Sequence, residues 1–256
     1  LARSRTLATR LVREGRVTVN GVVVTKPAAK VGPSDDLVAE EEVWVSRASH
    51  KLIGALDVLD VEVPARVLDA GASTGGFTQV VLSRGAELVH AVDVGRDQLS
   101  PVLREDPRVV VHEGLNLRDL TPDDLAIDDH FEPVDLVVGD VSFISLTMIM
   151  EPISAVMNPD GLMLLLVKPQ FEVGRKALGA HGVVTDPRAR ADALRGVLEE
   201  AAACGLGVLG LVESPISGGE GNIEYLVHLT RRQGVGLTWQ AQERRIAEIT
   251  STEGPR

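Results

Sequence analysis

Apolar and polar residues follow two alternating patterns over most of the chain. Runs that are apolar throughout recur between stretches whose apolar residues are three or four positions apart. We expect the apolar runs to form strands buried on both faces, at residues 66–69, 88–93, 109–112, 135–140, 162–168, 206–213 and 223–229. The amphipathic stretches predict helices, at residues 78–84, 145–157 and 187–204. This alternation predicts an α/β fold with a doubly wound sheet.

The last two predicted strands are joined by residues 214–222, which include Pro215 and three glycines. A connection this short leaves no room for a crossover helix, so the two strands must be antiparallel neighbours. Residues 46–232 therefore predict a Rossmann-like sheet of seven strands whose last strand is antiparallel.

A different pattern marks the N-terminal part. Residues 6–14 predict a helix that Gly15 ends, and the alternating stretch 16–19 leads into the turn Asn20-Gly21 and three further valines. This order resembles the second half of the small α-L RNA-binding domain found in a ribosomal protein and in many pseudouridine synthases. Because the chain begins without Met and lacks the first helix, we expect a truncated N-terminal α+β RNA-binding domain. A solvated basic helix beside a hairpin is the alternative.

Changes in composition along the chain predict the domain boundaries. Residues 33–42 are acidic and rich in turn formers, which is typical of a linker. We therefore expect a partial RNA-binding domain with its linker at 1–45, a catalytic domain at 46–232, and a C-terminal tail with a short helix at 233–256.

The chain has 256 residues, of which 44% are hydrophobic and 25% charged, enough for one sizeable core and a small appendage. Its net charge of −11 would repel a polyanion if it were spread evenly. Residues 1–31, however, hold seven basic residues and one acidic residue. This asymmetry predicts a basic RNA-binding module on an acidic catalytic body. The candidate RNA contacts are Arg3, Arg5, Arg10, Arg13, Arg16 and Asn20.

Several classes of protein are disfavoured by what the sequence lacks. The densest apolar run, 161–167, is far shorter than the roughly 20 residues of a membrane-spanning helix. Cys204 is the single cysteine, so we expect no internal disulfide, and no leader with a basic and then an apolar segment is recognisable. The six histidines are dispersed without metal-ligand spacing. We therefore expect a cytoplasmic protein that uses neither a membrane span nor a metal.

A glycine-rich turn, DAGASTGGFT at residues 69–78, follows the first strand of the predicted sheet. In open α/β sheets this position forms part of the ligand-binding crevice. The glycine spacing matches neither the dinucleotide fingerprint nor the phosphate-binding loop. It matches the D-x-G-x-x-x-G loop of S-adenosylmethionine-dependent methyltransferases. The candidate cofactor-binding residues of the turn are Asp69, Gly71, Ala72, Ser73, Thr74, Gly75, Gly76 and Phe77.

Two later strand ends supply further candidates for the same cofactor. Asp93 ends the second strand and Val94 follows it, at a position where a carboxylate can accept hydrogen bonds from both hydroxyls of a ribose. Asn116 follows the third strand and could contact the adenine. Because these positions occur together with an antiparallel last strand, we expect S-adenosylmethionine as the cofactor.

The same turn also matches the G-x-S-x-G elbow of serine hydrolases, with Ser73 as the nucleophile. In those enzymes the elbow normally follows several earlier strands, one of whose loops supplies an oxyanion hole. Here it follows the first strand of the sheet, and no His-Gly-Gly-Gly stretch precedes it. We therefore favour the methyltransferase interpretation.

Four charged residues stand at ends or starts of predicted elements, namely Lys51, Asp140, Lys168 and Glu224. Their order is that of FtsJ-like ribose 2′-O-methyltransferases. The chain, basic front end included, resembles the TlyA (hemolysin A) family of ribosomal RNA methyltransferases over residues 1–230. The stretches that carry the resemblance are KL at 51–52, the turn at 69–78, DVSFISL at 140–146, KPQFE at 168–172 and GNIEY at 221–225.

The resemblance implies a catalytic role for these four residues and, for Asp140, a contact with the cofactor as well. It further implies methylation of a ribose 2′-hydroxyl, of cytidine, in ribosomal RNA within ribosomal subunits. Methyl transfer from a sulfonium requires a group that orients the hydroxyl and removes its proton. We assign this role to Lys168, with Lys51 as a neighbouring cation, and the sequence leaves the reverse assignment open.

Two other functions are kept as alternatives. The older family name implies a hemolysin or pore former, which the expected absence of a spanning segment and a leader disfavours. A catalytically idle RNA-binding protein is disfavoured by the complete Lys-Asp-Lys-Glu set. Beyond these, four basic residues after Lys168 could bind RNA phosphates or form a merely solvated loop. They are Arg175, Lys176, Arg188 and Arg190.

Overall fold

The computed structural model describes residues 5–13, 15–39, 43–174 and 178–251. The chain divides into two compact units, Leu1–Val43 and Trp44–Arg256. The division falls close to the boundary expected near residue 45. The C-terminal segment, expected as a separate tail, belongs to the second unit.

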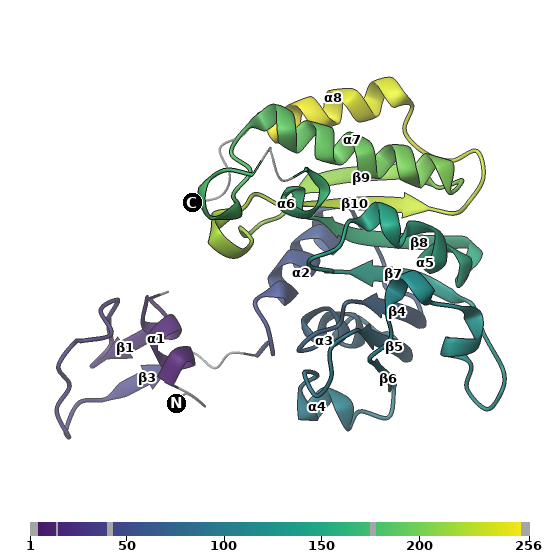
Figure 1. The fold of residues 1–256 in the computed structure, drawn as a ribbon. Coiled ribbons are helices and arrows are strands. Elements are labelled where there is room, and N and C mark those ends of the chain that lie inside the picture. The colour runs from purple at the N-terminus through teal and green to yellow at the C-terminus, as the bar shows by residue number, and fades with distance from the viewer. Residues whose placement is uncertain (1–4, 14, 40–42, 175–177, 252–256) are drawn as a thin grey trace. The chain divides into compact units, whose positions relative to one another are not determined.

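The N-terminal unit consists of one helix and a three-stranded antiparallel sheet (Figure 1). Asn20 and Gly21 both have positive φ angles, 52° and 77°, as the type I′ turn of a tight hairpin requires. Leu11 of the helix and Val17 of the central strand are buried and form the core of this unit. The elements are α1 (Arg5–Arg13), β1 (Val17–Val19), β2 (Val22–Val23) and β3 (Leu37–Ala39), with the sheet order β2-β1-β3.

The third strand corrects the expected linker, because β3 lies inside the stretch 33–42 and pairs with β1. The Asn20 side chain connects the hairpin to the segment before β3. Its Nδ2 donates to Asp35 Oδ1 at 2.9 Å, and its Oδ1 accepts from the backbone N–H of Asp36 at 2.9 Å. Asn20, expected to contact RNA, is therefore bonded within the unit, and the acidic segment stabilises this fold.

The second unit contains a seven-stranded sheet in the order β6-β5-β4-β7-β8-β10-β9 (Figure 1). Neighbouring strands are parallel except that β10 is antiparallel to both β8 and β9. The α/β class and the antiparallel last strand are confirmed. The placement of β10 between β8 and β9 was not predicted. The strands are β4 (Arg66–Ala70), β5 (Leu88–Asp93), β6 (Val109–Glu113), β7 (Val134–Gly139), β8 (Met157–Val167), β9 (Gly207–Glu213) and β10 (Tyr225–Thr230).

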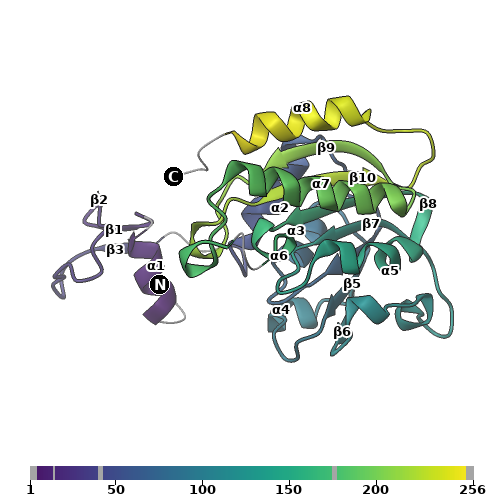
Figure 2. The same ribbon diagram turned by 45° about the horizontal axis from the view of Figure 1, so that its top comes forward.

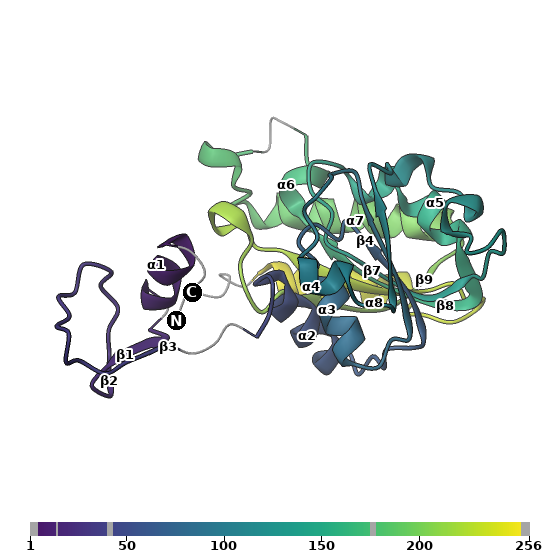
Figure 3. The same ribbon diagram turned by 90° about the horizontal axis from the view of Figure 1, so that it is seen from below.

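Helices cover both faces of this sheet, as the turned views show (Figures 2 and 3). Val67 and Leu68, consecutive residues of β4, belong to different apolar clusters, so the clusters lie on opposite faces. One cluster is covered by α2, α3 and α4, and the other by α5, α7 and α8. The helices are α2 (Ala48–Val58), α3 (Gly76–Ser83), α4 (Pro101–Arg104), α5 (Met150–Ala155), α6 (Pro169–Glu172), α7 (Pro187–Ala203) and α8 (Trp239–Thr250).

Short 3-10 helices complete the second unit. The helix expected over 145–157 is divided into one of them and α5, and it ends early because β8 begins at Met157. No helix in the described part of the chain is long and apolar enough to cross a membrane. The 3-10 helices are Leu117–Asp119, Pro122–Leu125, Leu146–Met148, Ala180–Gly182 and Gly219–Gly221.

The C-terminal helix α8 packs against α7 and β9. Arg190 of α7 is buried, and its guanidinium donates to the carbonyl oxygens of Thr185 and Thr250, each at 3.0 Å. It connects the end of α8 to the loop before α7, so the expectation that Arg190 could bind RNA phosphates was wrong. Arg188 is exposed. The other two candidates of that group, at 175 and 176, lie outside the described residues.

Candidate active site

The candidate site lies at the edge of the sheet formed by the carboxyl ends of the parallel strands, at the point where the strand order reverses. β5 stands on one side of β4 and β7 on the other, so the loops that leave their carboxyl ends diverge and form a crevice. The glycine-rich turn follows β4, Asp140 follows β7, and Lys168 follows β8. Glu224 precedes β10, and because β10 is antiparallel, its first residue lies at the same edge.

Three positive φ angles shape the glycine-rich turn, at Gly71 (84°), Ser73 (49°) and Gly75 (95°). A side chain at Gly71 would bring its Cβ to 3.2 Å from Val141 Cα, and one at Gly75 would overlap Leu103. Glycine at these two positions therefore lets the turn pack against the loop after β7 and against α4.

Three of the side chains expected to bind a cofactor are buried. Phe77 is 2% exposed and Ala72 is 7% exposed, and both belong to the cluster under α2 and α3. Asp69 is fully buried, and its Oδ2 accepts from Thr78 Oγ1 at 2.6 Å. Burial raises the pKa of Asp69 to about 7. The structure thus places these three side chains beneath the turn.

Asp93, at the end of β5, joins two loops of the crevice. Its Oδ2 accepts from the backbone N–H of Ser73 at 2.8 Å, and its Oδ1 accepts from that of Gly95 at 2.7 Å. The side chain is half-buried, and each carboxylate oxygen keeps a further lone pair for a ligand. Asp93 is therefore placed to accept two more hydrogen bonds at the mouth of the crevice.

Two further candidate positions lie beside Asp93. Val94 is 71% exposed. The loop of Asn116 is joined to Asp93 by its neighbour Leu115, whose N–H donates to the Asp93 carbonyl oxygen at 3.2 Å. The Asn116 side chain accepts from the backbone N–H of Arg118 at 3.1 Å and caps a 3-10 helix. Its observed role is thus a local cap at the edge of the crevice.

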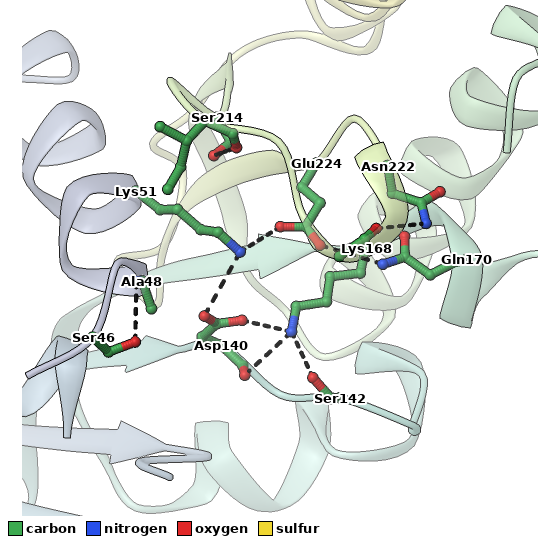
Figure 4. Close-up of polar contacts among 12 residues, drawn as sticks. Ser46, Ala48, Lys51, Asp140, Ser142, Lys168, Gln170, Ser214, Asn222 and Glu224 are labelled. Carbon is green, nitrogen blue, oxygen red and sulfur yellow. Dashed lines mark hydrogen bonds and ion pairs between the residues drawn. The ribbon is translucent and has the colours of Figure 1, made fainter. Parts of the chain in front are cut away.

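The structure brings together the four charged residues that the sequence singled out, here called the charged cluster (Figure 4). Lys168 Nζ lies 2.6 Å from Asp140 Oδ1. Lys51 Nζ lies 2.6 Å from Glu224 Oε2 and 3.9 Å from Asp140 Oδ2. Lys51, Lys168 and Glu224 are 7%, 8% and 2% exposed. Because each buried cation faces a carboxylate, the cluster avoids the penalty of an unpaired buried charge.

Neighbouring groups fix the charged cluster in place. Helix α2, which carries the first lysine, is joined to the start of α3 by Ser49 Oγ, which donates to the Gly76 carbonyl oxygen at 2.9 Å. Glu224 Oε1 accepts from Gln170 Nε2 at 3.2 Å. Gly218 packs so closely on Glu224 that a Cβ there would overlap its carboxylate. The carboxylate is therefore held from two sides.

Three residues beside Lys168 were missed by the sequence reasoning: Ser142, Phe143 and Phe171. Ser142 Oγ accepts a hydrogen bond from Lys168 Nζ at 2.7 Å. Phe143 is 91% exposed and has a φ of 65°, which a bulky residue rarely adopts. Its ring centroid lies 5.2 Å from that of Phe171. Each phenylalanine stands three residues after a member of the charged cluster, a spacing that could have indicated them.

The predicted RNA-binding arginines belong to the N-terminal unit. Arg5 and Arg13 are exposed on α1, and Arg16 is half-buried beside the start of β1. Arg3 and the side chain of Arg10 lie outside the described residues. The exposed guanidinium groups of α1 are therefore the described candidates for phosphate contacts.

The serine-hydrolase alternative lacks a general base. Ser73 has the positive φ typical of a nucleophile elbow, and its side chain and that of Thr74 are exposed. Its hydroxyl, however, donates to Gln98 Oε1 at 3.3 Å, and within the described residues it bonds to no histidine. The positive φ instead aims the Ser73 N–H at the carboxylate of Asp93.

Comparison with known proteins gives a consistent picture. A family model described as FtsJ-like methyltransferase matches residues 44–231, and one described as S4 domain matches residues 1–37. The chain is 44% identical to the 16S/23S rRNA (cytidine-2′-O)-methyltransferase TlyA of Mycobacterium tuberculosis, over all of this chain and 94% of the relative. 

Solved structures show the same fold. That of a candidate hemolysin from Streptococcus thermophilus is 38% identical, has a TM-score of 0.77, and is matched over 96% of this chain and 90% of that one. An S-adenosylmethionine-dependent methyltransferase from Mesorhizobium loti matches at 15% identity and a TM-score of 0.50, over 69% of this chain and 96% of that one. The second likeness is one of fold alone.

The sheet with its antiparallel β10, the crevice at β4 and β7, and the matching family model define a methyltransferase. The chain belongs to the TlyA family of FtsJ-like methyltransferases and begins with an S4 domain. The family resemblance indicated by the sequence motifs is confirmed.

Proposed function

We propose that this protein transfers a methyl group from S-adenosylmethionine to the 2′-hydroxyl of a cytidine in ribosomal RNA. The observation that carries the proposal is the buried charged cluster beside the crevice, in which Lys168 and Asp140 are 2.6 Å apart. A ribose hydroxyl is a poor nucleophile until a base takes its proton, and Lys168 is the candidate base beside the crevice. The name of the relative that matches the whole chain supports the choice of cytidine and of ribosomal RNA.

The crevice fits S-adenosylmethionine. Asp93 would hold the ribose hydroxyls, because both of its oxygens keep lone pairs at the crevice mouth. Gly71 brings the turn against Val141, so the turn lies next to Asp140. The Asp140 side chain is 14% exposed and would attract the positive charge of the cofactor. When bound, the sulfonium supplies an activated methyl group together with its leaving group.

Lys168 is the residue we assign as the base. Lys168 Nζ would take the hydroxyl proton as the ribose oxygen bonds to the methyl carbon and the methyl–sulfur bond breaks, which leaves a neutral thioether. Lys51 is held by Glu224 and lies 3.9 Å from Asp140, so it places a second positive charge near the base.

Exposed side chains of this protein support an RNA substrate. Arg5 and Arg13 of the S4 domain would bind phosphates. The exposed ring of Phe143, next to Ser142 and Lys168, offers a surface on which a base can stack. We infer that the protein acts on ribosomal RNA within ribosomal subunits and therefore in the cytoplasm.

The test is to incubate the protein with methyl-labelled S-adenosylmethionine and separate small and large ribosomal subunits, then measure label in the RNA. We expect label in at least one subunit, and none when Lys168→Met replaces the wild type. Equal labelling by Lys168→Met would remove the charged cluster from the mechanism. The exposed-surface variant Glu105→Gln is the control and should label RNA as the wild type does.

A further inference from the structure

Lys168 differs from Lys51 in the groups that surround its amine. The contacts of Lys51 Nζ within the described residues are with two carboxylates, those of Glu224 and Asp140. Lys168 Nζ has one carboxylate at 2.6 Å, the hydroxyl of Ser142 at 2.7 Å and the Asp140 carbonyl oxygen at 3.5 Å. Figure 4 shows the Ser142 hydroxyl directed at the amine. Within the described part of the chain, neutral oxygens accept from Lys168 and not from Lys51.

We propose that Ser142 is a positioning residue for Lys168, an inference that rests on the proposed role of Lys168 as the base. A neutral amine has two N–H groups and one lone pair. When Asp140 and Ser142 each accept one N–H, the lone pair points away from both of them. Ser142 and Phe143 are exposed, so a nucleotide can approach the amine beside them. Ser142 therefore orients the lone pair toward the ribose hydroxyl.

Contacts on both sides hold the loop that carries Ser142 in place. Val141 is buried against the glycine-rich turn. On the other side, Glu172 accepts from Ser145 Oγ at 2.5 Å and from the backbone N–H of Leu146 at 2.9 Å. Glu172 ends α6, which starts directly after Lys168. The loops of Ser142 and Lys168 are therefore joined by a second contact, which holds the Ser142 hydroxyl beside the Lys168 amine.

The experiment compares Ser142→Ala and Ser142→Thr with the wild type in the full-length chain. Single-turnover methylation of ribosomal subunits is measured against pH at saturating cofactor, with KM for both substrates measured separately. We expect Ser142→Ala to slow the transfer step about tenfold, as loss of one hydrogen bond to an ionisable group does. Both KM values should stay unchanged. Ser142→Thr keeps the hydroxyl and should restore most of the rate.

Rescue by threonine and the KM values separate positioning from a structural defect. A merely distorted loop would not be restored by the hydroxyl of Ser142→Thr, and it would change KM as well as the rate of transfer. Ser83→Ala, which removes an exposed hydroxyl bonded to the Val80 carbonyl oxygen at the end of α3, should behave as the wild type.

Two results would overturn the inference while leaving the proposed function intact: an unchanged rate in Ser142→Ala, or a Ser142→Thr variant as slow as Ser142→Ala. If Lys168→Arg transferred methyl groups as fast as the wild type, the role of Lys168 would fail and the inference would fail with it. The Lys168 variant therefore distinguishes failure of the base from failure of its positioning residue.

Discussion

Tyr225 of β10 lies opposite Val167 of β8 in the antiparallel register of these two strands. Each of these two residues is next in sequence to a member of the charged cluster: Glu224 directly precedes Tyr225, and Lys168 directly follows Val167. A parallel β10 would carry Glu224 to the opposite edge of the sheet. The reversed strand direction therefore places this carboxylate where it pairs with Lys51.

Replacement of Glu224 tests that pairing. Glu224→Gln leaves Lys51 without its carboxylate at 2.6 Å, while Asp140 remains at 3.9 Å. We expect the free energy of unfolding to fall by about 3 kcal/mol, because a buried cation loses its main partner. Chemical denaturation measures this, with the exposed substitution Glu105→Gln as the control. Equal stability of the two variants would show that the pair contributes little to the fold.

The two lysines should respond differently to substitution by arginine. Lys168→Arg keeps the positive charge but cannot release a proton near neutral pH, so turnover should fall by about 100-fold or more. Lys51→Arg should be milder, because a guanidinium still supplies the neighbouring charge to Asp140. Single-turnover rates are compared with binding of cofactor and RNA, which should persist in both. Substantial activity in Lys168→Arg would transfer the role of base to Lys51.

Asp93 should matter for the cofactor. Asp93→Ala removes the acceptors for the ribose hydroxyls and should weaken binding of S-adenosylmethionine by about 1 to 3 kcal/mol. Isothermal titration calorimetry measures the affinity, and circular dichroism checks that the variant is folded. Asp119→Ala, an exposed change in a nearby loop, should bind normally. Unchanged affinity in a folded Asp93→Ala protein would mean that the pocket lies elsewhere.

The buried carboxyl group of Asp69 predicts a pH-dependent stability. Burial raises the pKa of Asp69 from 3.8 to about 7. Between these two pH values the folded protein therefore keeps a proton on Asp69 that the unfolded chain has released. The contribution of this proton binding to the free energy of unfolding is complete below about pH 4 and is lost as the pH rises through about 7. Asp69→Asn keeps an acceptor for Thr78 Oγ1 but does not titrate.

We therefore expect the stability of the wild type, relative to Asp69→Asn, to fall by up to about 4 kcal/mol between pH 4 and pH 7. Urea unfolding at a series of pH values gives this difference and cancels the other titrating groups. A constant difference across the series would show that Asp69 is ionised in the folded protein throughout.

The S4 domain should recruit the substrate through charge. Each phosphate contact adds roughly 0.7 to 0.9 to the slope of log affinity against log salt concentration. Replacing both Arg5 and Arg13 by Ala should weaken RNA binding and flatten that slope, whereas Arg108→Ala in the second unit should not. Filter binding at several salt concentrations measures both. A slope that does not change would assign recruitment to the methyltransferase domain.

Much of the architecture could be predicted from local sequence patterns. Strands such as β5 are covered on both faces, so they read as continuous apolar runs. The antiparallel direction of β10 followed from the short connection at 214–222, but its place between β8 and β9 depends on pairing between distant residues. β3 escaped prediction because its three residues, Leu37–Ala39, stand in an acidic stretch and are held by pairing with the distant strand β1.

The site, like the architecture, could be predicted only where local sequence carries the signal. Lys51, Asp140 and Lys168 were recognised because, together with Glu224, they stand at ends or starts of predicted elements in the order found in FtsJ-like methyltransferases. Burial could not be foreseen for Asp69, since a glycine-rich motif does not reveal which of its side chains face the core. Ser142 was missed because its contact with Lys168 depends on the loop conformation around the positive φ of Phe143.

Alkaline hydrolysis of labelled RNA tests the central claim most directly. Alkali cleaves RNA through the free 2′-hydroxyl, so a 2′-O-methyl group protects the adjacent phosphodiester, whereas a methyl group on a base does not. After reaction of the wild-type protein with methyl-labelled S-adenosylmethionine and ribosomal subunits, we expect label in alkali-resistant dinucleotides whose first nucleoside is cytidine. Label recovered only in mononucleotides would contradict it, because the methyl group would then lie on a base.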